Sequence, residues 1–245
     1  MKTKSSAFTL AELLVVIGLI GVVATMTIPN LANNSGNQKN TLRLQKTYQT
    51  LNEAYGRASA KYGPMSTWFT SDMDETAKQD KIAARFKEFL SVQRDCGTGN
   101  GCYPDEKTKT SKGLVLDDVI AKTTHPKMLL ASGVAIDFYV QPKEKGDSIL
   151  EESDIFMGEL ILGQVRVGTS GINETPIYGR NLFIFTLTDT GVRPNGLNDV
   201  TKCFSSPDSC AAWVIKYGNM DYLDAGDDGV CKNGTQLSKS MTTCH

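Results

Sequence analysis

Residues 7–28 read AFTLAELLVVIGLIGVVATMTI, an apolar run with one charged residue, Glu12. The part from Phe8 to Ile28 has 21 residues. As a helix rising about 1.5 Å per residue it would be roughly 31 Å long, enough to cross the hydrocarbon core of a bilayer. A carboxylate inside such a helix costs on the order of 2.5 kcal/mol or more, so Glu12 requires a partner.

An amine is the nearest candidate partner for Glu12. Cleavage between Ala7 and Phe8 would create a positive α-amino group at Phe8, four residues before Glu12 and on the same helical face. The acid could then pair with its own terminus or with that of a neighbouring copy. Such a pair would make Glu12 a candidate assembly residue.

This segment resembles the N-terminal signal of type IV pilins and type II secretion pseudopilins, in which a basic leader and a small residue precede Phe-Thr-Leu-x-Glu. The resemblance implies that prepilin peptidase cuts between Ala7 and Phe8 and N-methylates Phe8, and that Glu12 neutralises a neighbour's amine during filament assembly. The family usually has glycine where this chain has Ala7, which implies slower cleavage. Pro29 lies where pilin helices commonly carry a proline, and it belongs to the candidate assembly residues.

Two other interpretations compete with this one. A secretory signal peptide also has a basic start and an apolar core, and Val22–Ala24 is an acceptable cleavage site, but Glu12 would then lie inside the apolar core. An unprocessed membrane anchor leaves Glu12 unexplained. Both fit the segment less well than a filament subunit does.

Lys2 and Lys4 precede the apolar run and should stay cytoplasmic, so the rest of the chain should be translocated. With the resemblance, this implies a single-pass protein of the bacterial inner membrane, with a periplasmic or extracellular C-terminal domain and a place in a surface filament after assembly. The partners implied are prepilin peptidase, sibling pilin or pseudopilin subunits, an inner-membrane platform protein, an assembly ATPase system and, before assembly, membrane lipid.

Six cysteines lie beyond residue 95, an even number that suits a domain in an oxidising compartment. Zinc fits them poorly, because no Cys-x-x-Cys occurs and the chain has two histidines. Local disulfides are favoured by the spacing, and the candidate pairs are Cys96 with Cys102, Cys203 with Cys210, and Cys231 with Cys244.

Charge and motifs disfavour catalysis and nucleic-acid binding. The chain has 26 basic and 27 acidic side chains, which gives no sign of a phosphate-binding surface. It contains no glycine-rich phosphate loop, no GxSxG and no HExxH, so we expect no enzyme activity and no catalytic residues. His125, which precedes a proline, is expected to be an exposed turn residue.

Calcium is the one cofactor that the sequence leaves as a possibility. Asp224, Asp227 and Asp228 could supply hard oxygen ligands for calcium, and some pseudopilins bind calcium in a C-terminal loop. However, the spacing does not match an EF-hand, and acids among glycines are typical of simple turns. We therefore expect no metal, with calcium as the weaker alternative.

Periodicity predicts the rest of the fold. Polar residues 33–37 suggest a bend or pause after the apolar helix. A stripe of apolar residues then predicts an amphipathic helix that lies on a sheet and ends at Gly63-Pro64. The stripe consists of Leu44, Tyr48, Leu51, Tyr55, Ala58 and Tyr62.

The sequence beyond this helix predicts further elements. A second helix is expected over residues 72–92, capped by Ser71 or Asp72, and a short helix or strand is expected over residues 210–217. Expected strands are residues 113–119, 133–140, 155–167 and 182–188.

These patterns predict an α+β protein in which a long N-terminal helix, transmembrane and then amphipathic, packs on an antiparallel β-sheet with a disulfide-stapled C-terminal region. The expected parts are a leader (1–7), a transmembrane and filament-core helix (8–28), its amphipathic continuation (29–63) and an extracytoplasmic pilin-like domain (64–245). The resemblance implies a structural subunit, a minor pilin or a pseudopilin, that polymerises through its N-terminal helix. A membrane-anchored extracellular binding domain that does not polymerise is the alternative.

Overall fold

The structure is a computed structural model of the whole chain, and it describes residues 10–116, 120, 123–141, 155–156 and 159–244. Before Ser35 it describes the side chains of residues 13–17 and 19 alone. The chain divides into two compact units, Met1–Lys39 and Asn40–His245.

Helix α1 runs from Leu10 to Tyr62 and contributes to both units. The predicted pause at residues 33–37 is not found, because those residues are helical. These residues have a low helix propensity, but propensity is only a weak preference and does not by itself interrupt a long helix. The predicted end is confirmed: Gly63, at a φ of +82°, follows the last helical residue, and its N–H donates to the carbonyl of Ser59 at 2.9 Å.

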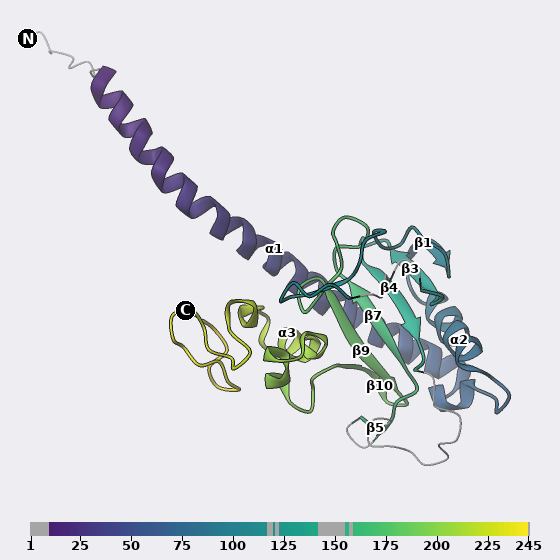
Figure 1. The fold of residues 1–245 in the computed structure, drawn as a ribbon. Helices are drawn as coiled ribbons and strands as arrows, with labels where there is room; N and C mark the ends of the chain where they lie inside the picture. Colours follow the sequence, from purple (N-terminus) through teal and green to yellow (C-terminus); the bar gives the residue numbers. More distant parts are fainter. Residues whose placement is uncertain (1–9, 117–119, 121–122, 142–154, 157–158, 245) are drawn as a thin grey trace, which may run out of the picture. The chain divides into compact units, whose positions relative to one another are not determined.

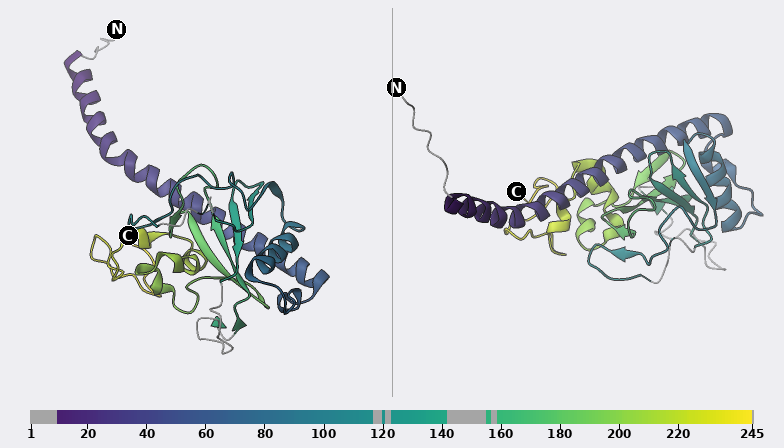
Figure 2. Two further views of the ribbon diagram at one scale, coloured as in Figure 1. Left: turned by 45° about the vertical axis from the view of Figure 1, so that its right-hand side comes forward. Right: turned by 90° about the horizontal axis from the view of Figure 1, so that it is seen from above.

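The predicted apolar stripe of α1 is buried within the second unit. Leu44, Leu51 and Ala58 are fully inaccessible to solvent, and Tyr48 stacks on Phe185 with ring centroids 5.6 Å apart. In both views of Figure 2, residues 40–62 run along the sheet. This part of α1 therefore forms the layer that covers one sheet face.

A 3-10 turn, Met65–Trp68, leads to helix α2, Glu75–Lys87. The prediction of a helix over residues 72–92 was too long at both ends. Asp74, rather than Ser71 or Asp72, is the N-cap, and its carboxylate accepts from the N–H of Ala77 at 2.7 Å. The predicted C-terminal end of this helix was wrong because Val92 begins a strand that pairs with residues 127–130.

The main sheet has the order β1-β3-β4-β7-β9-β8-β2, with β10 also paired to β9 (Figure 1). The antiparallel strands are β1 (Val92–Gly97), β3 (Lys127–Leu130), β4 (Ala135–Tyr139), β7 (Gly163–Gly168), β9 (Leu182–Thr188) and β10 (Gly191–Pro194). Two short strands, β8 (Ile177–Tyr178) and β2 (Lys109–Thr110), are joined in parallel. The sheet is therefore mixed, which corrects the purely antiparallel prediction.

The predicted strands were found in part. Residues 133–140 and 182–188 contain β4 and β9. Residues 155–167 divide among β7 and a separate two-stranded sheet made of β5 (Ile155–Phe156) and β6 (Glu159–Leu160). Within the predicted strand 113–119, Val115 forms an isolated bridge and residues 117–119 lie outside the described part. Strands β1, β2, β3, β8 and β10 were missed because they are short or mostly polar.

Alternate residues of the strands face two separate hydrophobic layers. On β9, Phe183, Phe185 and Leu187 join the core beneath α1, whereas Leu182 and Ile184 face a smaller cluster on the other side of the sheet. This alternation is the expected result of the two-residue side-chain period of a strand. The smaller cluster includes Tyr103, Ile120, Leu129, Ala135 and Tyr178.

The C-terminal region contains helix α3, Ala211–Tyr217, which confirms a short element over residues 210–217. Three-residue to five-residue 3-10 turns surround it: Val200–Phe204, Pro207–Ser209 and Asp221–Asp224. The three disulfides are the local pairs that the spacing favoured: Cys96–Cys102, Cys203–Cys210 and Cys231–Cys244.

Candidate functional site

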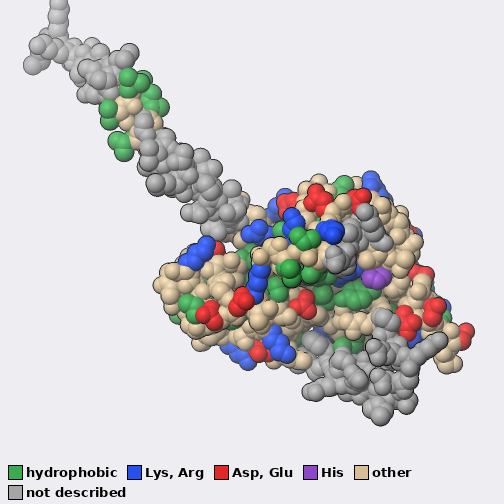
Figure 3. All heavy atoms as spheres, in the orientation of Figure 1, with side chains coloured by type: hydrophobic (Ala, Val, Ile, Leu, Met, Phe, Trp, Pro, Cys, Tyr) green, Lys and Arg blue, Asp and Glu red, His purple; other side chains and the backbone are tan. Residues whose placement is uncertain are grey.

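The N-terminal part of α1 exposes apolar side chains on every side. Within the first unit, residues 13–17 and 19 are between 53% and 63% exposed, and Figure 3 shows such hydrophobic side chains along the helix. Successive residues turn by about 100° around a helix, so five in a row cover its whole circumference. A helix that is apolar all round is normally buried in a membrane or among other helices.

The residues expected to be processed or to direct assembly lie mostly outside the described part. Ala7 and Phe8 precede it, and Glu12 and Pro29 are described as helical backbone without their side chains. Their roles therefore stay predictions.

Across the residues that it describes, the structure contains no helix both long and apolar enough to cross a membrane.

Comparison with known proteins concerns this same segment. Residues 2–28 match the model of the prokaryotic N-terminal methylation motif. This motif is the signature of type IV pilins and pseudopilins. The chain carries a pilin-type N-terminus. Neither the curated proteins nor the solved structures gave a match to the chain.

The pilin-type motif supports a precursor of the type IV pilin or pseudopilin kind. It implies processing by prepilin peptidase, assembly with pilin machinery, and a membrane-anchored precursor of a surface filament. The family that it marks is structural rather than enzymatic.

In the second unit, three charged residues form a ladder across neighbouring strands. Lys127 on β3 lies opposite Asp137 on β4, which in turn lies opposite Arg166 on β7. All three are buried, with Lys127 and Asp137 fully so. Arg166 donates to the Oδ2 atom of Asp137 from Nε at 2.9 Å and from Nη2 at 2.7 Å. The sequence analysis did not predict this ladder. The pattern that could have indicated it is a single charged residue within each of three apolar strands.

Burial and neighbouring charges shift the pKa values of the residues in and around the ladder. Burial alone would raise the pKa of Asp137, but the charge of the Arg166 guanidinium and its hydrogen bonds hold that pKa below its usual value. Burial lowers the pKa of Lys127, against the opposing effect of Asp137. Burial, reinforced by the charge of Asp137, raises the pKa of Tyr103 well above its usual value. Tyr103 therefore keeps its proton and donates to Oδ1 of Asp137 at 3.1 Å.

His125 belongs to this network, which corrects the expectation of an exposed turn residue. Its side chain is 25% exposed, and its ring stacks on Tyr139 with centroids 5.3 Å apart. The Nδ1 atom lies 2.7 Å from Nη2 of Arg166. Because a guanidinium can only donate, Nδ1 accepts this hydrogen bond. The ladder and His125 together tie β4 and β7 to the segment before β3, which is a structural role.

Lys127 connects the ladder to the first disulfide loop. Its ammonium donates to the carbonyls of Thr98 at 3.1 Å, Gly99 at 3.3 Å and Thr123 at 2.5 Å. An ammonium has three protons, so these carbonyls satisfy it completely. The loop closed by Cys96 and Cys102 is thus held against the sheet by a buried charge as well as by its disulfide.

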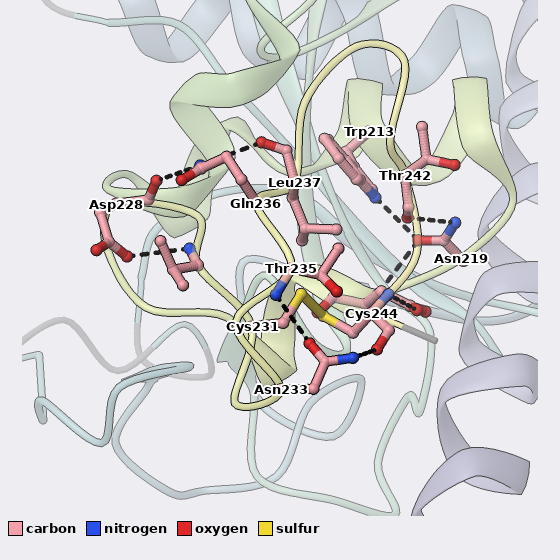
Figure 4. The surroundings of a disulfide bond; sticks show 12 residues. Trp213, Asn219, Asp228, Cys231, Asn233, Thr235, Gln236, Leu237, Thr242 and Cys244 are labelled. Atoms are coloured by element: carbon pink, nitrogen blue, oxygen red, sulfur yellow. Dashed lines mark hydrogen bonds between the residues drawn. A yellow bond between two sulfur atoms is a disulfide. The ribbon is translucent and has the colours of Figure 1, made fainter.

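The third disulfide fastens the end of the chain (Figure 4). The N–H of Cys244 donates to Oδ2 of Asp221 at 2.9 Å, and Asn219 donates to the carbonyl of Thr242 at 3.1 Å. Asn219 also accepts from the indole of Trp213, a fully buried residue of α3. These contacts anchor the C-terminal loops to the core of the domain.

Two of the three calcium candidates, Asp227 and Asp228, are engaged in other contacts. The carboxylate of Asp227 forms an ion pair with Lys112, and that of Asp228 accepts from the N–H of Val230 at 3.0 Å. Asp224 lies on the 3-10 turn Asp221–Asp224. Within the part of the chain that the structure describes, no cluster of three or more histidine, cysteine or acidic side chains is arranged to hold a metal ion.

Proposed function

We propose that the chain is a structural subunit of a type IV pilus or type II secretion filament and that it polymerises through its N-terminal helix. The observation that carries this proposal is the methylation motif at residues 2–28, placed at the head of a helix with apolar side chains on all sides. Burial of such a helix among identical helices would remove that apolar surface from water.

On this proposal, three residues of the motif have roles. Prepilin peptidase would cut between Ala7 and Phe8 and methylate the new amine of Phe8. Glu12 would pair with the Phe8 amine of a neighbouring subunit. Since an unpaired carboxylate is costly in an apolar environment, this pair would favour one axial register of the helices over others.

The proposal also gives roles to the rest of the chain and to its partners. Residues 8–28 would anchor the precursor in the inner membrane, and residues 29–63 would continue the helix into an extracytoplasmic domain that ends at residue 245. Sibling subunits, the platform protein and the assembly ATPase would act on the anchored precursor. Within this class, we propose a minor pilin or a specialised pseudopilin.

Glu12→Ala tests polymerisation. We expect the variant to insert in the membrane as the wild type does but to assemble poorly, measured by the subunit recovered from sheared filaments against that in the membrane fraction. Glu53→Ala, at an exposed position of the same helix, is the matched control and should assemble normally. Recovery of the wild type and both variants in the membrane fraction alone, with none in sheared filaments, would favour the alternative, a membrane-anchored extracellular binding domain that does not polymerise. Normal assembly of Glu12→Ala into filaments would contradict the role proposed for Glu12.

Processing is tested separately. Mass spectrometry of protein from a strain with its own prepilin peptidase should find a chain that begins at N-methylated Phe8. An N-terminus at Met1, or one produced by cleavage after Ala24, would contradict the proposed processing.

A further inference from the structure

Three Asn-Gly dipeptides occur in the chain, at residues 100–101, 195–196 and 233–234. In such a dipeptide, the backbone nitrogen of glycine can attack the side-chain carbonyl carbon of asparagine, because glycine has no Cβ to obstruct the approach. The three sites therefore share the same reacting groups. They differ in the hydrogen bonds and the packing around those groups.

At residues 233–234 both reacting groups are held. The side chain of Asn233 accepts from the N–H of Thr235 at 3.0 Å and donates to the carbonyl of Cys244, as Figure 4 shows. The N–H of Gly234 donates to the carbonyl of Cys231 at 2.9 Å. Attack of this nitrogen on Asn233 would require all three hydrogen bonds to open.

At residues 195–196 the surroundings are closed. The Oδ1 atom of Asn195 accepts from Thr186 at 2.7 Å, and its backbone N–H and carbonyl bond to neighbouring segments. Gly196 is packed so closely that a Cβ would lie 2.0 Å from the carbonyl oxygen of Ser209. Attack by the nitrogen of Gly196 would therefore require the hydrogen bond from Thr186 to open within a closely packed segment.

At residues 100–101 the reacting groups are open. Asn100 is exposed within the loop that Cys96 and Cys102 close. Among the residues that the structure describes, none forms a hydrogen bond with its side chain or with the N–H of Gly101. The loop is held instead by its carbonyls: Lys127 donates to Thr98 and Gly99, and Arg94 donates to Gly101 at 3.0 Å.

We propose that Asn100 is a site of spontaneous deamidation. The nitrogen of Gly101 forms a bond to Cγ of Asn100, the bond from Cγ to Nδ2 breaks, and ammonia leaves with the proton that the glycine nitrogen loses. Water then adds to either carbonyl of the cyclic imide and opens it to aspartate or isoaspartate. No oxidant or reductant takes part.

The product adds a negative charge to a loop that two cations hold. Arg94 and Lys127 both donate to carbonyls within three residues of position 100. A carboxylate at position 100 therefore forms in a locally basic environment, which favours its ionised form. The proposal does not depend on filament assembly, because the loop belongs to the second unit.

The test uses the full-length oxidised chain in detergent, incubated at mildly alkaline pH and followed by peptide mass spectrometry. Opening each of the three hydrogen bonds at residues 233–234 reduces the reactive population roughly fivefold, so Asn100 should react about a hundredfold faster than Asn233. After reduction and denaturation the three sites should react at similar rates. Equal rates in the folded chain, or slower reaction at Asn100, would overturn the proposal.

Isoelectric focusing gives a second measurement. The wild type should accumulate a more acidic species during incubation, and Asn100→Gln should not do so at that rate. Asn233→Gln is the matched control and should keep the acidic shift of the wild type. Persistence of the shift in Asn100→Gln would assign the reaction to another residue.

Discussion

At the Asp137 carboxylate a guanidinium, a phenol hydroxyl and an imidazole converge inside the sheet. Each of these side chains comes from a different segment of the chain, so a single substitution affects several segments at once. A buried ion pair is not by itself strong evidence for stability, because desolvation offsets the attraction between its charges. Removal of one partner has a clearer consequence, since it leaves the other charge buried and unpaired.

Arg166→Met tests this consequence. We expect the variant to lower the free energy of unfolding by about 3–5 kcal/mol, because Asp137 loses its buried counter-ion. Denaturant titration of the oxidised protein would measure it. Arg57→Met, at an exposed position of α1, is the matched control and should change the value by less than about 0.5 kcal/mol. A small effect of Arg166→Met would show that the ladder contributes little.

Asp137 also predicts a dependence on pH. Its pKa is lower in the folded chain than the ordinary carboxyl value of 3.8. The folded state therefore binds this proton less readily than the unfolded state, and the resulting stability is complete above the ordinary value and is lost as pH falls through the folded pKa. Asp137→Asn should lose less stability than the wild type between pH ~5 and pH ~2. Denaturant titrations across this range would measure the difference, and parallel curves would contradict the prediction.

At the scale of elements, polar contacts at two places fix α1 along the sheet. Near its entry to the domain, Asn40 accepts from the hydroxyl of Thr169, and Arg43 donates to the carbonyl of that residue, both at 2.9 Å. Further on, Asn52 accepts from the N–H of Val192 at 3.2 Å, and Tyr55 donates to the carbonyl of Asp189. The apolar stripe buries the helix, whereas these contacts set its axial position.

Tyr55→Phe and Asn40→Ala should each reduce the free energy of unfolding by about 1–2 kcal/mol, because each removes a hydrogen bond that a buried side chain makes. The positions are 15 residues apart in a helix, or about 22 Å, so the two effects should add within about 0.5 kcal/mol. Denaturant titration of both single variants and the double variant would measure this. Lys46→Ala, on the exposed face, serves as the control. A strongly non-additive double variant would show that the two places act as one contact.

At the scale of the whole molecule, the disulfides and the charged loops determine how the C-terminal region stays folded. Sequence separations of 6, 7 and 13 residues make all three disulfides local. In the chain-entropy model, a longer loop gives greater stabilisation. The Lys112–Asp227 ion pair links the acidic loop to a segment distant in sequence.

Replacement of Cys231 and Cys244 by alanine should lower the free energy of unfolding by about 3 kcal/mol, somewhat more than the same change at Cys96 and Cys102. Denaturant titrations of the two double variants under oxidising conditions would compare them. A larger loss at the shorter loop would show that local packing outweighs loop entropy.

Calcium should have no effect on stability, because Asp227 and Asp228 already have partners. Thermal unfolding with calcium and with a chelator should therefore give the same Tm. A calcium-dependent increase that Asp227→Asn abolishes would show that the ion displaces Lys112.

The local parts of this protein could be predicted from its sequence: the N-terminal motif, the stripe of α1, the cysteine pairs and strands β4 and β9. Each depends on residues close together in the chain, where spacing fixes geometry. The tertiary structure alone decided the mixed pairing of β8 and β2, the burial of Lys127, and the partners of Asp137. Those features join residues far apart in sequence, such as Asp137 and Arg166, 29 positions apart, and only the packed sheet decides whether a charge meets a counter-ion or water.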